Sequence, residues 1–164
     1  MELYLLRHGI AAEKGGAFAR DSDRTLTDEG IQRMRRIAKA MKGLELSFDL
    51  ILSSPFVRAI QTAEIVAEIL SLDKVLRLTP NLAVGGDPSL LIKEIKSEGP
   101  EKVLLVGHEP YLSTMISVLI SGHDDLGIVI KKGGLCKLSA DSLRFGKCAT
   151  LEWLMGPRQI LDNK

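Results

Sequence analysis

The chain has 164 residues, of which 45% are hydrophobic and 26% are charged. These proportions predict one folded domain over residues 1–164 and exclude a disordered chain. The formal net charge of +1 provides no overall field that would attract nucleic acid or an anionic membrane, so affinity for an anion must come from a local cluster.

Cysteine spacing and hydropathy give further limits. Cys136 and Cys148 lie in no C-x-x-C pattern and have no suitably spaced histidines, which argues against a zinc site. The apolar start of the chain is too short for a signal peptide and is ended by Arg7. No apolar run is long enough to span a bilayer, and we therefore expect a cytoplasmic protein.

Short apolar runs alternate with helical patterns in the first half of the chain. In order, we predict a buried strand at residues 3–6, a polar loop from 9 to 24, a helix capped by Thr27 and ended by Gly43, a buried strand at 50–52, a helix with Ser54 as cap and Pro55 at its first position, and a short strand at 75–78.

The second half continues the alternation and ends in a hairpin. We predict a loop at residues 81–88, a short helix at 90–95, an apolar strand at 102–106, a helix from about Pro110 towards Ser121, and two final strands at 135–138 and 149–154. Strands that alternate with helices predict an α/β three-layer sandwich, in which helices cover both faces of a mostly parallel sheet. The final hairpin would give this sheet an antiparallel edge.

Residues suited to phosphate chemistry follow three of the predicted strands. Arg7-His8-Gly9 follows the first, a segment ending at Arg58 follows the second, and Gly107-His108-Glu109 follows the strand at 102–106. Ligands of open α/β sheets bind outside the carboxyl ends of the strands. If these strands are neighbours, two arginines and two histidines converge in one crevice.

Each of these residue types has a role in such a crevice. Arginine binds phosphate oxygens bidentately and stays charged, and Arg58 would also lie near a helix N-terminus, which favours anions. His8 would be the nucleophile, Gly9 would permit close approach and an unusual backbone angle, and His108 would stabilise developing charge. Taken singly, His108 could cap a helix and Arg58 could be a solvated charge; their joint placement favours a site.

Four motifs in this order resemble the histidine phosphatase superfamily, and the resemblance covers most of the chain. They are Leu6-Arg7-His8-Gly9, Leu26-Thr27-x-x-Gly30, Ser54-Pro55-x-x-Arg58-Ala59-x-Gln61-Thr62 and Val106-Gly107-His108. The short length and the lack of large insertions look most like the SixA phosphohistidine phosphatase branch.

The resemblance implies a phosphoglycerate mutase-like fold and a set of roles. His8 would carry a transient phosphoryl group, Arg7 and Arg58 would hold the phosphoryl oxygens, and His108 would complete the pocket. Arg24 would lie at the rim. No metal and no organic cofactor is expected.

One departure from the superfamily bears on the substrate. Mutases and broad phosphatases of this superfamily place a glutamate acid in the loop after the third strand, but residues 81–87 here contain none, and Asp87 is not an obvious replacement. An alkoxide leaving group needs a proton donor, whereas imidazole, with a pKa of about 6.5, needs less help. We therefore expect the substrate to be a phosphohistidine on a protein, such as a histidine phosphotransfer domain.

Two alternatives remain open at this stage. Glu109 follows His108, where the acid phosphatase branch has an aspartate donor, so the chain could instead hydrolyse small phosphate esters with Glu109 as the acid. A favourable charge at the start of the following helix is the plainer interpretation of Glu109. A phosphate-binding module without turnover is the second alternative, although every expected catalytic residue is present.

Overall fold

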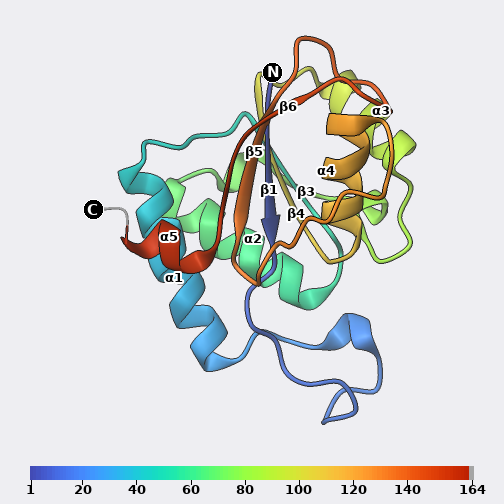
Figure 1. Ribbon diagram of the computed structural model, residues 1–164. Coiled ribbons are helices and arrows are strands. Elements are labelled where there is room, and N and C mark those ends of the chain that lie inside the picture. Colours follow the sequence, from blue (N-terminus) through green and yellow to red (C-terminus); the bar gives the residue numbers. More distant parts are fainter. Residues whose placement is uncertain (163–164) are drawn as a thin grey trace.

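The computed structural model describes residues 1–162 and contains a single six-stranded sheet with the order β3-β2-β4-β1-β5-β6 (Figure 1). The strands are β1 (Glu2–Arg7), β2 (Leu50–Ser53), β3 (Leu76–Leu78), β4 (Lys102–Gly107), β5 (Leu135–Ser139) and β6 (Thr150–Met155). The first four in chain order run parallel, and β5 pairs antiparallel with both β1 and β6. The predicted mixed sheet with an antiparallel edge is confirmed.

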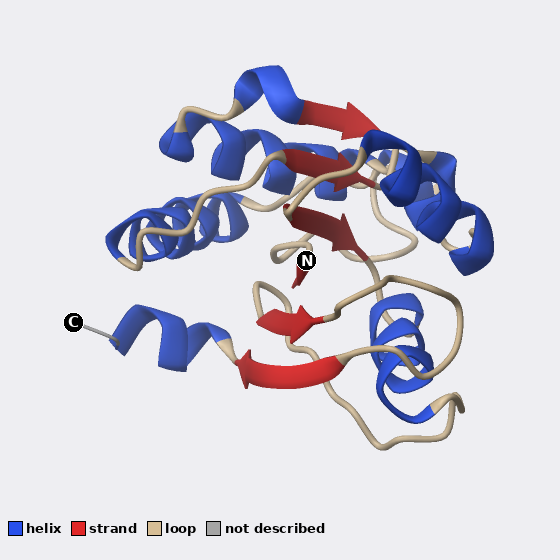
Figure 2. Ribbon diagram, turned by 90° about the horizontal axis from the view of Figure 1, so that it is seen from above, coloured by secondary structure: helices blue, strands red, loops and turns tan. Residues whose placement is uncertain are grey.

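Helices cover both faces of this sheet (Figure 2). They are α1 (Asp28–Gly43), α2 (Val57–Leu70), α3 (Pro88–Glu98), α4 (Tyr111–Ser121) and α5 (Pro157–Asp162), with 3-10 turns at Asp21–Asp23, Asp73–Val75 and Pro80–Leu82. The core clusters divide between the two faces: buried apolar side chains of α1, α2 and α5 belong to one cluster and those of α3 and α4 to the other. The predicted three-layer α/β sandwich is therefore confirmed.

The continuous apolar run of β1 is explained by these two clusters. Leu3 and Leu5 pack with the α3–α4 side, whereas Tyr4 and Leu6 pack with the α1–α2 side. Successive side chains of a strand point to opposite faces, so a strand between two helical layers must be apolar at every position. β4 is built in the same way and lies beside β1 at the centre of the sheet.

The register of the central strands places three strand ends at one level. Arg7, the last residue of β1, lies opposite Gly107, the last of β4, and Ser53, the last of β2, lies opposite Val106. The residues that follow these strands therefore emerge side by side at the carboxyl edge of the sheet. The condition on which the sequence-based site depended, that the three strands are neighbours, is met.

The start of α2 differs from the prediction. The helix begins at Val57, with Phe56 as its capping residue, rather than at Pro55 with Ser54 as cap. The Ser54 hydroxyl does accept a hydrogen bond from the backbone N–H of Phe56, at 3.3 Å, but its other contact is with His108, at 2.7 Å. Ser54 and Pro55 thus form the turn between β2 and α2, and Arg58 still falls in the first turn of the helix.

The observed bounds of α3, α1 and α5 also differ from the predicted ones or depend on other residues than predicted. α3 is longer than predicted because Asp87 caps it, accepting hydrogen bonds from the N–H groups of Ser89 and Leu90. α1 does extend to Gly43, but the residue with a positive φ beyond it is Glu45, so Gly43 is not a left-handed cap. α5 was not predicted; its short sequence has too few positions to show a helical period.

The start of α1 is tied to the loop that carries the residues after His8. The side chain of Thr27 caps the helix by accepting from the N–H of Gly30, at 3.0 Å, and the N–H of Thr27 donates to the carbonyl of Ile10. Helix and loop approach so closely that a Cβ at position 30 would lie 2.1 Å from that carbonyl oxygen. Only glycine fits there.

We predict that Gly30→Ala destabilises the protein by about 1–3 kcal/mol, because the added methyl group must displace the Ile10 backbone. Urea unfolding measures the effect. Gly43→Ala is the matched control: a Cβ there meets nothing within 4 Å, and the change should stay within about 0.5 kcal/mol. Equal stability of the two variants would contradict the close packing of α1 on this loop.

Candidate active site

A cavity of about 530 Å³ opens at the carboxyl edge of β1 and β4. The sequence predicted seven site residues, and six of them line this cavity. The seventh, Gly9, does not. The lining residues are Arg7, His8, Ala11, Ala12, Glu13, Lys14, Asp21, Arg24, Arg58, Val84, His108, Glu109, Pro110 and Lys132. Five of these side chains are lysine or arginine and three are acidic, so the local charge favours an anion even though the whole chain is nearly neutral.

His8 lines this cavity and has only 5% of its surface exposed. Its Nδ1 is 2.7 Å from the carbonyl oxygen of Gly9. Because a carbonyl can only accept, Nδ1 carries the proton and donates it, which leaves the lone pair of the neutral ring on Nε2. The Nε–H of Arg58 donates to that nitrogen at 3.2 Å. The atom suited to nucleophilic attack therefore lies next to a guanidinium that can bind phosphoryl oxygens.

Gly9 does not line the cavity but contacts the ring of His8 through its backbone. Its carbonyl fixes the His8 ring, and its N–H donates to the hydroxyl of Thr62, at 3.1 Å. A Cβ at position 9 would lie 2.7 Å from Cγ of the buried Met34. Glycine is thus needed here for close packing against α1. The close approach of a ligand, for which Gly9 was expected to leave space, stays a prediction. The expected unusual backbone angle is wrong, because Gly9 is absent from the positive-φ residues.

Arg58 is almost completely buried, at 3% exposure, and is held by Asp21. Its two terminal nitrogens donate to the Asp21 carbonyl at 2.7 Å and to the Asp21 carboxylate at 3.0 Å. The other carboxylate oxygen of Asp21 accepts from Nε of Arg24 at 2.9 Å, and the two residues form an ion pair. Burial raises the pKa of Asp21, but the hydrogen bonds from Arg58 and Arg24 outweigh it and the pKa is lowered. Asp21 therefore links the two arginines as a charged bridge.

Arg7, the last residue of β1, lines the same cavity. One terminal nitrogen donates to the carbonyl of Ile130 at 2.8 Å, while the Nε atom is buried without a hydrogen-bond partner among residues 1–162. A buried donor without an acceptor is costly, so a bound oxyanion would satisfy it.

His108 lies next to His8, with 5.1 Å between the ring centroids. It is 2% exposed, and its Nε2 is 2.7 Å from the hydroxyl of Ser54. Phe56 packs on the ring at a centroid distance of 5.0 Å. Arg7, His8, Arg58 and His108, which come from three separate strand ends, thus share one pocket.

Glu109 lines the same cavity. Its contacts fit both a charge at the start of α4 and a proton donor facing the site. One carboxylate oxygen accepts from the hydroxyl of Ser113, at 2.5 Å, in the first turn of α4. The second oxygen, Oε1, is buried without a hydrogen-bond partner in the described chain. One oxygen of the carboxylate thus binds the first turn of α4, and the other is free to form a hydrogen bond with a ligand.

Both buried histidines are uncharged at neutral pH. Burial lowers the pKa of His8 to about 3; the Gly9 hydrogen bond opposes this, and the nearby cations add to it. Burial, with a contribution from Arg58, lowers the pKa of His108 to about 4. A neutral imidazole retains the lone pair that a nucleophile needs.

Three residues with clear contacts in this site received no site role from the sequence. Asp21 lies in the polar loop, where only its spacing of three residues from Arg24 hinted at an ion pair. Ser54 and Thr62 belong to a recognised motif, but their partners come from other strands and could not be read from local spacing.

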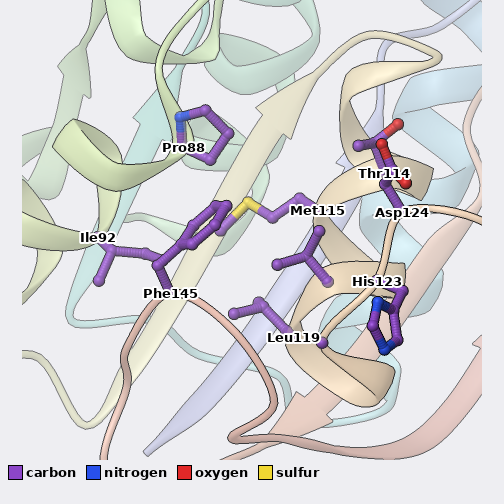
Figure 3. A pocket seen from close by; sticks show the side chains of 10 residues that line it. Pro88, Ile92, Thr114, Met115, Leu119, His123, Asp124 and Phe145 are labelled. Atoms are coloured by element: carbon purple, nitrogen blue, oxygen red, sulfur yellow. The ribbon is translucent and has the colours of Figure 1, made fainter.

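A second hollow, of about 330 Å³, lies between α3 and α4 and contains none of these residues. It is mainly apolar, and Figure 3 shows the side chains of Met115 and Phe145 among those that line it. The third histidine, His123, lies at its edge and is exposed, as expected for a loop residue. The three histidines therefore separate into a buried pair, His8 and His108, that lines the first cavity and an exposed residue, His123, that lines the second.

Residues 1–162 contain neither a cluster of metal ligands nor a membrane-spanning helix. No group of three or more His, Cys, Asp or Glu side chains in this part of the chain is placed to hold a metal ion. No helix in it has the length and apolar character needed to cross a membrane. The cytoplasmic location stays a prediction from the sequence.

Comparisons with known proteins agree with the geometry. The family model of the histidine phosphatase superfamily (branch 1) matches residues 3–83. The phosphohistidine phosphatase SixA of Escherichia coli K12 is 30% identical over 160 residues, which cover 96% of this chain and 94% of that protein. An uncharacterized protein of Picosynechococcus is 36% identical over 147 residues, or 88% of each chain. The chain therefore belongs to the histidine phosphatase superfamily.

Solved structures extend this result to the whole fold. A structure of the protein histidine phosphatase SixA complexed with tungstate matches with a TM-score of 0.84 and 29% identity, covering 98% of this chain and 99% of that one. A phosphoserine phosphatase of Entamoeba histolytica shares the fold at 19% identity, with a TM-score of 0.72 and coverage of 96% and 98%. The phosphoglycerate mutase-like fold is thus matched, and the enzyme class is that of the phosphatases.

We predict that the stability of the protein falls as the pH drops below about 6.5. The unfolded chain binds protons at His8 and His108 near their ordinary pKa, while the folded chain resists protonation down to about 3 and 4. Stability is therefore complete above the unfolded pKa and is lost as the pH falls. Urea unfolding at a series of pH values measures the slope.

His8→Asn should flatten this slope by up to about 1.4 kcal/mol per pH unit, because one of the two groups is removed. The exposed His123, changed to Asn, is the control and should leave the slope as it is. An unchanged slope in the His8 variant would show that His8 titrates normally in the folded protein.

Proposed function

We propose that this phosphatase removes phosphate from phosphohistidine on a protein, with His8 as the transient phosphoryl carrier. In the first step, Nε2 of His8 attacks phosphorus and the bond between phosphorus and the substrate imidazole breaks. The substrate ring leaves as neutral imidazole once its other nitrogen carries a proton. Water then attacks phospho-His8, releasing inorganic phosphate and the free His8 ring.

The binding residues support this sequence of steps. Arg58 and Arg7 would hold the phosphoryl oxygens, with His108 as a neutral hydrogen-bond donor and Arg24 at the rim. The N–H of Arg58 that now contacts Nε2 of His8, at 3.2 Å, would turn to a phosphoryl oxygen when the substrate enters. SixA, the relative crystallised with tungstate, binds an oxyanion of the same tetrahedral shape as phosphate.

The single observation that favours phosphohistidine over other substrates is the wall formed by the β3–α3 loop. That loop contributes only Val84, which is 56% exposed, and no proton donor. An imidazole with a pKa of about 6.5 leaves without a strong acid, whereas an alkoxide does not. The proposed partner is therefore a histidine phosphotransfer domain or a similar phosphoprotein.

We predict that His8→Ala lowers phosphate release from a phosphorylated histidine phosphotransfer protein by at least about 1,000-fold, since no nucleophile remains. A single-turnover reaction of the unsubstituted enzyme should trap an acid-labile, base-stable phosphoryl group that is lost in the variant. His123→Ala is the matched control and should keep full activity. Persistent activity of the His8 variant would refute the proposal.

A second candidate, hydrolysis of small phosphate esters, is favoured by one observation: Oε1 of Glu109 is buried and has no partner in the described chain. If Glu109 protonates alkoxide leaving groups, Glu109→Gln should lower phosphomonoester turnover by about 100-fold. Phosphohistidine hydrolysis should change much less, because its leaving group needs no acid. Side-by-side assays on both substrates separate the two functions, and equal losses on both would contradict this division.

A further inference from the structure

Ser54 is a completely buried serine whose hydroxyl contacts only two groups in the described chain. The backbone N–H of Phe56 donates to its oxygen at 3.3 Å, and Nε2 of His108 lies 2.7 Å away. The Phe56 N–H can only donate, so it uses a lone pair of the hydroxyl and leaves the hydroxyl proton free. Nε2 of His108 is the acceptor within reach of that proton.

This direction of donation determines where His108 carries its own proton. A ring nitrogen that accepts a hydrogen bond has no proton, so the neutral ring must be protonated on Nδ1. Burial keeps the ring neutral at pH 7, because it lowers the pKa of His108 to about 4. The opposite tautomer would leave the buried hydroxyl proton of Ser54 without an acceptor, which is unfavourable.

The Nδ1 atom itself is buried and has no hydrogen-bond partner in residues 1–162. His108 lines the cavity, and its ring centroid is 5.1 Å from that of His8. An unpaired Nδ1–H of His108, on a ring next to that of His8, can donate to a ligand that has acceptor oxygens. A phosphoryl dianion has acceptors only and would be repelled by an Nδ1 lone pair.

We propose that Ser54 is a positioning residue that sets the tautomer of His108, so that an Nδ1–H donor is available to a phosphoryl oxygen. The ring is also fixed in place by Phe56, whose own ring packs on it at 5.0 Å and lies under the guanidinium of Arg58 at 5.1 Å. The inference rests on the proposed function only in taking the ligand to be a phosphoryl group.

The tautomer can be measured directly in the ligand-free protein. The chain has three histidines, so nitrogen-15 NMR of the labelled imidazoles gives few signals to assign. We expect His108 to be protonated on Nδ1 at neutral pH. Ser54→Ala should give a mixture of tautomers, and Ser54→Thr, which keeps the hydroxyl, should restore the Nδ1–H form. A His108 protonated on Nε2 in the unsubstituted protein would overturn the proposal without any variant.

Ser53→Ala is the matched control for packing effects. Ser53 is equally buried, but its hydroxyl donates to the Ser54 carbonyl, at 3.0 Å, and not to His108. In Ser54→Ala we expect inorganic phosphate to bind about 10-fold more weakly and kcat to fall about 10- to 100-fold. Ser54→Thr and Ser53→Ala should stay within about 3-fold of the unsubstituted enzyme.

The outcomes separate this inference from the proposed function. Equal losses in Ser53→Ala and Ser54→Ala, or an unchanged tautomer and phosphate affinity in Ser54→Ala, would overturn the role of Ser54 while leaving phosphohistidine hydrolysis by His8 intact. Failure of the His8→Ala test would overturn the proposed function, whereas the tautomer, which is read without substrate, would still stand or fall by the NMR result.

Discussion

The parallel pairing of β1 with β4 and of β4 with β2 is the constraint on which the site depends. The register brings Arg7 level with Gly107 and Ser53 level with Val106. His8, Ser54 and the residues after β4 therefore emerge at one edge although they are far apart in the chain. The strands hold this register because each is apolar on both faces and is packed between helical layers.

Burial at that edge lowers the pKa of both histidines and keeps their rings neutral. The same low exposure that keeps His8 and His108 neutral also strengthens their hydrogen bonds to Gly9 and Ser54. The positive charge needed to bind phosphate is carried by arginines, which stay protonated when buried. Asp21 offsets part of that charge and holds Arg58 beside His8. Two neutral imidazoles and several cationic guanidinium groups thus share one small cavity.

The relation to the superfamily gives these contacts their context. The fold is shared with phosphatases of different stated substrates, SixA and a phosphoserine phosphatase among them. The fold alone therefore does not identify the substrate. The wall after β3 is Val84, and among residues 1–162 the one carboxylate with a buried oxygen that lacks a hydrogen-bond partner is that of Glu109, after β4. These two positions distinguish the proposed substrate from its alternative.

The sequence by itself determined the strands and their alternation with helices, because the period of apolar residues is a local property. It also singled out His8, Arg58 and His108 as candidates for a phosphate site, because the chemistry of a residue is local too. It placed the start of α2 two residues early and missed α5, since caps and short helices depend on tertiary partners. Only the folded chain decided that Asp21 bridges two arginines, that Gly9 is required by Met34, and that Ser54 contacts His108. Each of these contacts joins segments that the sequence alone cannot bring together.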